Sequence, residues 1–294
     1  MAEKDTTEKV LLSIDEVFAD VINVFAFHGD QVISPADLRN DVVMTTYDHA
    51  DQIRSQERDV SKFWVKGDVR ILLSGIENQT TADRDMPLRV IGYDGASYRG
   101  QLADSSKESA RYPVMTVVLY FGEQEWDKPK NLLGCFDNWD EIPDAMKPLI
   151  HDYPINVFDI PRMNPEDVEL FRSDFRVVAD YFVQKHRNHR YQPRRGKMKY
   201  IKQVCDLLAA ATGDRHFVDK YNIIAQAKEG GPDDMCEIVE QFIEEGKAEG
   251  ELNAMLKLVS QNLLPAQIAA EQTGLTVEEF HAKLNDYLSK AKKD

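Results

Sequence analysis

The segment VRILLSGIENQT, residues 69–80, joins an apolar run to a short polar end. Alternate residues of a β-strand point to the same face of a sheet, so Glu77 and Gln79 would share a face and Asn78 would point away. An acid and an amide in this pattern form either an ordinary polar strand end or one half of a metal-dependent cleavage site. The residues that the fold brings beside this strand end decide between the two.

A β-hairpin is predicted around Gly67-Asp68, with the apolar run as its second strand. The register of this hairpin determines whether Asp59 lies near Glu77. A two-residue turn pairs Asp59 with Ile76, on the wrong face, whereas a three-residue loop pairs it with Glu77. We predict the pairing with Glu77, through the longer loop or an equivalent bulge.

The first two thirds of the chain alternate between helical and strand patterns. Three segments have the apolar spacing or the end signals of helices: residues 14–27, 86–103 and 165–186. Two further segments have the composition of strands: residues 112–122 and 153–160. Ser13 and Glu16 form a predicted capping box at the start of the first helix. The order of these elements predicts an α/β core of roughly 185 residues.

From Pro193 onward the pattern is helical to the end of the chain. We expect a domain of residues 1–190 and a helical region of residues 191–294, which begins with a basic linker. Near the end, Thr276 and Glu279 form a second predicted capping box between two short helices. These helices resemble a small helix-turn-helix, and two packed helices without a role in DNA binding explain the pattern equally well.

The composition is that of a water-soluble protein, with 43% hydrophobic and 30% charged residues. The longest apolar run, residues 114–121, is far too short to cross a bilayer, and the polar residues 1–10 are unlike a secretory signal. The three cysteines lie far apart, which fits reduced thiols better than disulfides or a zinc site. These features predict a cytoplasmic protein without a membrane partner.

The net charge of −15 argues against a nucleic-acid partner, because phosphate binding needs a cationic surface. The charge is uneven, however, since residues 181–205 contain no acid and eight basic residues. Six of these are predicted to hold the DNA backbone: Arg187, Arg190, Arg194, Arg195, Lys197 and Lys199. A solvated linker explains this basic run about as well, and Pro193 and Gly196 favour that alternative.

Hydrolysis of a phosphodiester needs a metal ion that activates water and shields the charge of the phosphate. Mg²⁺ prefers oxygen ligands, and proteins usually hold it with one or two carboxylates together with the phosphate of the substrate. Asp59 and Glu77 on adjacent strands fit this requirement. Asp20 lies four residues after Glu16 on the polar face of the first helix and is a further candidate ligand. By spacing alone, a polar strand end remains the commoner explanation.

A resemblance to a known family favours the cleavage site. Four segments in this order resemble the recombination-promoting nuclease (Rpn) family of transposase-related proteins, within the PD-(D/E)XK nuclease superfamily: DEVFADVINVFAFHGDQVISPADL, ERDV, GIENQT and MPLRVIGYDGASYRGQ. The C-terminal segments MCEIVEQFIEEGKAEGE and PAQIAAEQTGLTVEEF resemble the tail of such proteins. The resemblance implies an αβββαβ nuclease core with an all-helical C-terminal extension. It also implies a DNA endonuclease that uses Mg²⁺ or Mn²⁺ and acts in recombination or with mobile elements.

The resemblance assigns roles to three residues. Asp59 and Glu77 would bind the metal, and Gln79 would stand where the superfamily usually has a lysine that orients water and stabilises the transition state. A neutral amide can position water or phosphate, but it cannot neutralise developing charge. Arg89, in the helix after the site, is the best candidate for a phosphate contact.

Two other functions stay open beside the nuclease. A nuclease fold could bind DNA or a protein partner without cutting it, because Gln79 and the acidic net charge both weaken the case for catalysis. The acidic helical tail could also join copies of the chain into a homo-oligomer.

Overall fold

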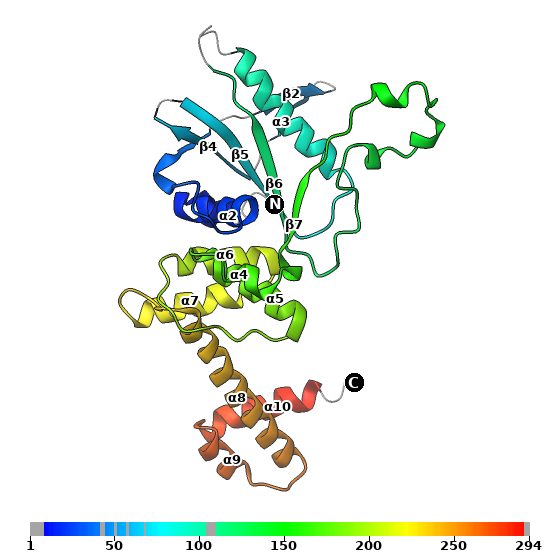
Figure 1. Ribbon diagram of the computed structural model, residues 1–294. Helices are drawn as coiled ribbons and strands as arrows, with labels where there is room; N and C mark the ends of the chain where they lie inside the picture. Colours follow the sequence, from blue (N-terminus) through cyan, green and yellow to red (C-terminus); the bar gives the residue numbers. More distant parts are fainter. Residues whose placement is uncertain are drawn as a thin grey trace. The chain divides into compact units, whose positions relative to one another are not determined.

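The computed structural model describes residues 9–41, 45–49, 52–56, 59–67, 69–103 and 110–290. The chain divides into two compact units, Met1–Asp233 and Asp234–Asp294 (Figure 1). This division falls after the expected boundary at residue 190, because helices α6 (Ile201–Thr212) and α7 (His216–Ala227) belong to the first unit.

The first unit is built on a five-stranded mixed sheet in the order β1-β4-β5-β6-β7. The strands are β1 (Leu38–Asn40), β4 (Val60–Lys66), β5 (Val69–Gln79), β6 (Val114–Tyr120) and β7 (Asn156–Asp159). Strands β1, β4 and β5 are antiparallel, whereas β5, β6 and β7 are parallel. A separate antiparallel pair is formed by β2 (Thr45–His49) and β3 (Gln52–Gln56). The predicted α/β class is confirmed.

Short 3-10 helices lie between these elements: Pro35–Asp37, Leu133–Cys135, Trp139–Glu141, Lys147–Leu149 and Ile160–Arg162. Three of them fall in the long connection between β6 and β7. Tyr153, near the end of that connection, donates a short hydrogen bond of 2.5 Å to the buried carboxylate of Asp94. The connection is therefore anchored to helix α3 (Met86–Ala103), which carries Asp94.

The register of the β4–β5 hairpin is set by a bulge. At the turn, Lys66 pairs with Val69 across Gly67 and position 68, and position 68 lies outside the described residues. The register shifts between Trp64 and Val65, so that β4 begins with Val60 opposite Ile76. One residue further along, this register brings Asp59 opposite Glu77. The pairing predicted from the sequence, through a bulge, is confirmed.

Two helices cover opposite faces of the sheet: α2 (Asp15–Phe27) and α3. On one face, Met86 of α3 packs against Val118 of β6, which is the register partner of Glu77. On the other face, Phe18 of α2 contacts Lys62 of β4, which pairs with β5 an odd number of residues from Glu77. Glu77 therefore points toward α3 and away from α2.

The capping box predicted for Ser13 and Glu16 is wrong. The Ser13 hydroxyl donates to the carbonyl of Val10, and α2 begins without a side-chain cap. The Glu16 carboxylate instead accepts hydrogen bonds from Lys199 at 2.6 Å and from the Tyr200 hydroxyl at 3.1 Å. Glu16 is therefore drawn to the basic run, whose charge outweighs what a backbone amide offers.

The single helix predicted over residues 165–186 is also wrong. The segment forms two helices: α4 (Pro165–Val168) and α5 (Phe175–Asn188). Between them, the backbone amides of Arg172 and Ser173 donate to Oδ2 of Asp20, at 2.9 Å and 2.7 Å. Asp20 is buried on α2, so a partner far away in the sequence takes these amides and interrupts the helix.

The second unit consists of three helices: α8 (Met235–Ser260), α9 (Ala266–Gln272) and α10 (Val277–Lys290). Their shared core is formed by five buried residues: Leu256, Ala269, Ala270, Phe280 and Leu284. The capping box predicted for Thr276 and Glu279 is confirmed, because each side chain accepts the backbone amide of the other residue. Within the described residues of both units, no helix is long and apolar enough to cross a bilayer.

Candidate active site

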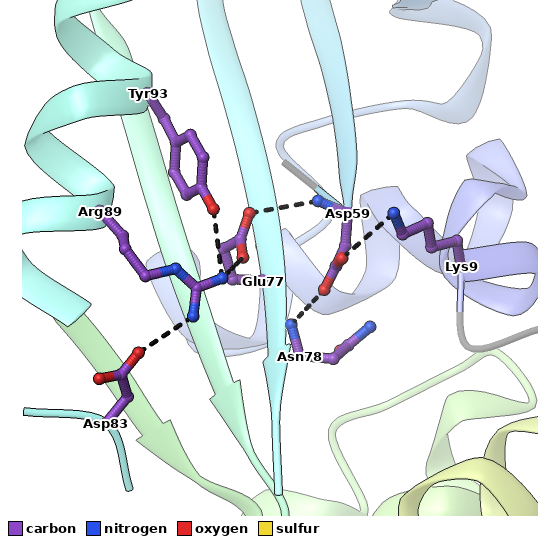
Figure 2. A network of polar contacts seen from close by, with 7 residues as sticks. All are labelled: Lys9, Asp59, Glu77, Asn78, Asp83, Arg89 and Tyr93. Carbon is purple, nitrogen blue, oxygen red and sulfur yellow. Dashed lines mark hydrogen bonds and ion pairs between the residues drawn. The ribbon is translucent and has the colours of Figure 1, made fainter. Parts of the chain in front are cut away.

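Glu77 is a buried carboxylate at the end of β5, with 1% of its side chain exposed. Its Oε1 accepts a hydrogen bond from the backbone amide of Asp59 at 3.2 Å, and its Oε2 lies 3.3 Å from Nη2 of Arg89 (Figure 2). A charge at this depth is tolerated only with such partners, because leaving water costs an ionised carboxylate several kcal/mol. Glu77 is therefore held in one place by a strand on one side and a helix on the other.

Asp59 lies directly before β4 and completes the arrangement. Its Oδ2 accepts a hydrogen bond from the backbone amide of Asn78 at 2.7 Å, and its Oδ1 lies 3.5 Å from Nζ of Lys9 (Figure 2). Only 13% of the Asp59 side chain is exposed. Asp59 and Glu77 thus each bind the backbone of the other's strand. The structure brings together the two acids that the sequence singled out.

Arg89 comes from α3 and has three partners. Its Nη1 donates to Oδ2 of Asp83 at 3.1 Å, and its Nη2 donates to the Tyr93 hydroxyl at 3.2 Å as well as to Glu77. Arg89 and Tyr93 are four residues apart and therefore lie on the same face of the helix. Burial by itself lowers the pKa of Arg89, but the hydrogen bond from its guanidinium to Tyr93 and the charge of Glu77 raise it above the ordinary value. The Arg89 guanidinium is a permanent positive charge.

Gln79 lies on the same face of β5 as Glu77 and is half-buried. Its backbone carbonyl accepts a hydrogen bond from the amide of Phe121 at 2.8 Å. Among the described residues, its side-chain amide has no hydrogen-bond partner. The amide is therefore available to a bound molecule.

Two other polar residues of α3 do not belong to the site. The Tyr98 hydroxyl accepts a hydrogen bond from the amide of Val114, and the Gln101 side chain bonds both backbone groups of Tyr112. They fix the start of β6 to α3, which is a structural role.

Asp20 lies apart from Asp59 and Glu77. Across the described ranges, no three His, Cys, Asp or Glu side chains gather closely enough to hold a metal ion together. Asp20 receives the two amides that precede α5, although its Oδ1 is buried without a hydrogen-bond partner. The structure therefore gives Asp20 a place in the packing of α2 against the α5 region rather than in the acidic pair.

The acidic pair suits a hard divalent cation. Each of the two carboxylates accepts a backbone amide of the neighbouring strand at the open end of the hairpin, and the amide of Gln79 emerges on the same face as Glu77. Mg²⁺ and Mn²⁺ accept such oxygen donors, and a site with two protein carboxylates leaves positions for water and phosphate. The donor set thus fits the metal that the sequence led us to expect.

The basic run is partly neutralised by acids of the same unit. Arg194 forms an ion pair with Glu169, and Lys199 forms one with Glu16 at 2.6 Å. Arg187 makes only a long contact of 3.5 Å to the carbonyl of Met163. Two exposed members have neither an ion pair nor a hydrogen bond in the part of the chain that the structure describes: Arg190 and Lys197. These two are the most accessible cations of the run for a phosphate.

Two residues of the site were missed in the sequence. Lys9 lies in a short helical stretch before α2, and no local pattern connects it with Asp59. Asp83 precedes α3, and its Oδ1 accepts the backbone amide of Asp85. Asp83 lies just before a helix, and Arg89 follows six residues later within that helix. This local pattern could have pointed to the contact between the two residues.

Comparison with known proteins places the chain in a family. The family described as "Putative transposase, YhgA-like" matches residues 66–220. The match covers more than half of the chain, so the protein belongs to this family, which is the Rpn family identified above by resemblance. Glu77, Gln79 and Arg89 fall within the matched residues, and Asp59 lies shortly before them. No curated protein and no solved structure matches the chain.

Proposed function

We propose that this protein is a metal-dependent DNA endonuclease that acts in recombination or with mobile elements. The observation that carries the proposal is a pair of hydrogen bonds at the open end of the hairpin: the Glu77 carboxylate accepts the backbone amide of Asp59, and the Asp59 carboxylate accepts the backbone amide of Asn78. A structural salt bridge to a single cation would need only one of the two carboxylates. Membership in a transposase-related family supports DNA as the substrate.

The order of the elements supports a PD-(D/E)XK nuclease core. The main sheet and its helices follow one another along the chain as α2, β1, β4, β5, α3 and β6. This is an αβββαβ sequence, with β2 and β3 inserted as a separate pair. The two acids lie on the second and third of these strands or next to them, Asp59 directly before β4 and Glu77 on β5.

Each residue of the site has a defined task in this proposal. Asp59 and Glu77 would hold Mg²⁺ or Mn²⁺, which would supply an activated water molecule and shield the charge of the phosphate. Gln79 would donate a hydrogen bond from its free amide to the water or to a phosphate oxygen. Lys9 would limit the repulsion between the two acids before the metal binds, because it lies beside Asp59.

The basic run would hold the DNA backbone. Arg190 and Lys197 would contribute most, since neither has to give up an ion pair or a hydrogen bond first. A smaller contribution would come from the members that already have contacts within the protein: Arg187, Arg194, Arg195 and Lys199. The acidic remainder of the chain would confine DNA to this region.

A second function is favoured by one observation. Cations lie beside both carboxylates, Arg89 beside Glu77 and Lys9 beside Asp59, so the pair is neutralised without any metal. Such a site could belong to a protein that binds DNA or a protein partner and does not cut.

Plasmid cleavage separates the two functions. The full chain is incubated with supercoiled plasmid in Mg²⁺, in Mn²⁺ and in EDTA. The nuclease is expected to nick or linearise the plasmid with either metal and not in EDTA. DNA binding that weakens steeply with salt, without cleavage in any metal, would favour the binding protein instead.

A further inference from the structure

Helix α3 brings a cation to the place where β5 lacks one. Glu77 and Gln79 are two residues apart on the same strand, so both side chains emerge on the face that α3 covers. Arg89 reaches that face from α3 and lies 3.3 Å from the Glu77 carboxylate (Figure 2). A positive charge is therefore present beside the acid of β5, although the strand position that could supply it is a glutamine.

The Arg89 guanidinium is held ready for a further ligand. Asp83, Tyr93 and Glu77 take three of its five N–H groups. The Nε–H and one Nη1–H have no partner among the described residues. With 36% of the side chain exposed, these donors can reach a ligand in solvent. A planar guanidinium fixed in this way suits the oxygens of a phosphate.

Neither lysine of β4 can supply this charge, because Lys66 pairs with Val69 at the turn, the opposite end of the hairpin from Glu77, and Lys62 is turned away. Lys62 of β4 is 1% exposed and points to the opposite face of the sheet. Its ammonium donates to Asp15 and to Asn40, both at 2.6 Å. The cation that serves the face of Glu77 must come from elsewhere in the fold, and α3 provides it.

We propose that Arg89 is a catalytic residue that replaces the missing lysine of β5: it contacts the phosphate of the bound DNA and stabilises the charge that develops during cleavage. The proposal rests on the nuclease function proposed above. It explains how a site with Gln79 retains a cation where the transition state needs one. It also gives the ion pair with Glu77 a purpose, because this pair holds Arg89 in position before substrate arrives.

The test uses charge relocation in the full chain. The variants are Arg89→Gln, the double variant Gln79→Lys with Arg89→Gln, and Arg84→Gln as a matched control. Arg84 lies five residues before Arg89 but pairs with Asp137, away from Glu77. The first measurement is the salt dependence of binding to a short duplex with Ca²⁺ present, and the second is the single-turnover cleavage rate in Mg²⁺.

Arg89→Gln is expected to lower the salt slope of binding by about 1, the loss of one phosphate contact. It is also expected to slow cleavage about 100-fold. The added lysine at position 79 should restore the slope and most of the rate, while Arg84→Gln should change neither. An unchanged slope in Arg89→Gln, or no recovery in the folded double variant, would overturn the proposal.

Two further comparisons keep the outcome decisive. If Arg89→Gln fails to fold, Glu77→Gln is compared with Glu77→Gln/Arg89→Gln, in which no buried carboxylate is left alone. A lower slope in the second of these supports the phosphate contact, and equal slopes reject it. If the wild type binds DNA but cuts none, the nuclease function fails by itself. The slope then still decides whether Arg89 contacts phosphate.

Discussion

The backbone amide of Asp59 donates to the carboxylate of Glu77, 18 residues later in the chain, over 3.2 Å. The carboxylate of Asp59 in turn accepts the amide that follows Glu77. The geometry of the acidic pair and the register of the β4–β5 hairpin therefore depend on each other. The bulge between Trp64 and Val65 makes this possible, because without it Asp59 would lie opposite the wrong residue.

The ion pair between Arg89 and Glu77 should contribute measurably to stability. Arg89→Gln leaves a buried carboxylate with one cation fewer, so the free energy of unfolding should fall by about 1–3 kcal/mol. Glu77→Gln/Arg89→Gln should lose less than the sum of the two single variants, because the pair is removed as a whole. Urea unfolding of the four proteins measures this coupling. Strictly additive losses would show that the two residues do not interact.

Asp20 should matter for stability and not for the acidic pair. Asp20→Ala leaves the amides of Arg172 and Ser173 without their acceptor, which should cost about 1–2 kcal/mol, as for the loss of a helix cap. Asp20→Asn keeps an acceptor oxygen and should lose less. Urea unfolding gives the stabilities, and calorimetric titration gives the affinity for Mn²⁺. A stable Asp20→Ala variant with impaired metal binding would contradict the account.

The stability of the first unit should fall in alkaline solution because of Cys205. Burial raises the pKa of this thiol from the ordinary value of 9.0 to about 12. Between these values the unfolded chain is ionised at Cys205 while the folded chain keeps the proton. The folded state thus binds more protons, and stability declines by up to about 1.4 kcal/mol for each pH unit above 9.

Cys205→Ala should remove this part of the alkaline decline. Urea midpoints at about pH 8 and pH 10.5 are compared for the wild type, for Cys205→Ala and for Leu208→Ala. Leu208 is equally buried on α6 and carries no titratable group, so its variant should lose stability at both pH values alike. An alkaline decline that is the same in Cys205→Ala and in the wild type would reject the prediction.

Members of the basic run should differ in their contribution to DNA binding. Arg190→Gln and Lys197→Gln should each lower the salt slope by about 1, because these side chains are exposed and have no ion-pair partner in the described chain. Arg194→Gln should lower it less, since Arg194 is paired with Glu169. Fluorescence anisotropy with a labelled duplex over a range of KCl concentrations measures the slopes. Equal slopes for all three variants would contradict the prediction.

Local patterns predicted the elements around the site well. The apolar run of β6 and the helical segment of α3 are both visible in the local sequence, and both elements form where they were expected. The hairpin register followed from a two-residue periodicity and from the requirement that Asp59 and Glu77 meet. The Thr276–Glu279 capping box was also predictable from the local sequence, because its two partners lie within one helical turn of each other.

What the sequence did not reveal depends on distant partners. Residues 165–186 have the pattern of a helix, but the carboxylate of Asp20, some 150 residues earlier, takes two of its amides. The Glu16 carboxylate likewise binds Lys199 instead of forming the expected local cap. Lys9 reaches Asp59 only because the fold brings its helix there. A charged side chain pairs with the group that binds it most strongly in the folded protein. That partner cannot be identified from the residues next to it in the sequence.

The central claim is that Asp59 and Glu77 together bind the metal that cleaves DNA. Its most direct test is the single-turnover cleavage of one plasmid in Mg²⁺ by the wild type, Asp59→Asn, Glu77→Gln and Asp137→Asn. Either substitution in the pair is expected to abolish cleavage. Asp137→Asn, which changes an exposed acid that pairs with Arg84 outside the site, should retain it. Equal cleavage by all four proteins would contradict the assignment of the site.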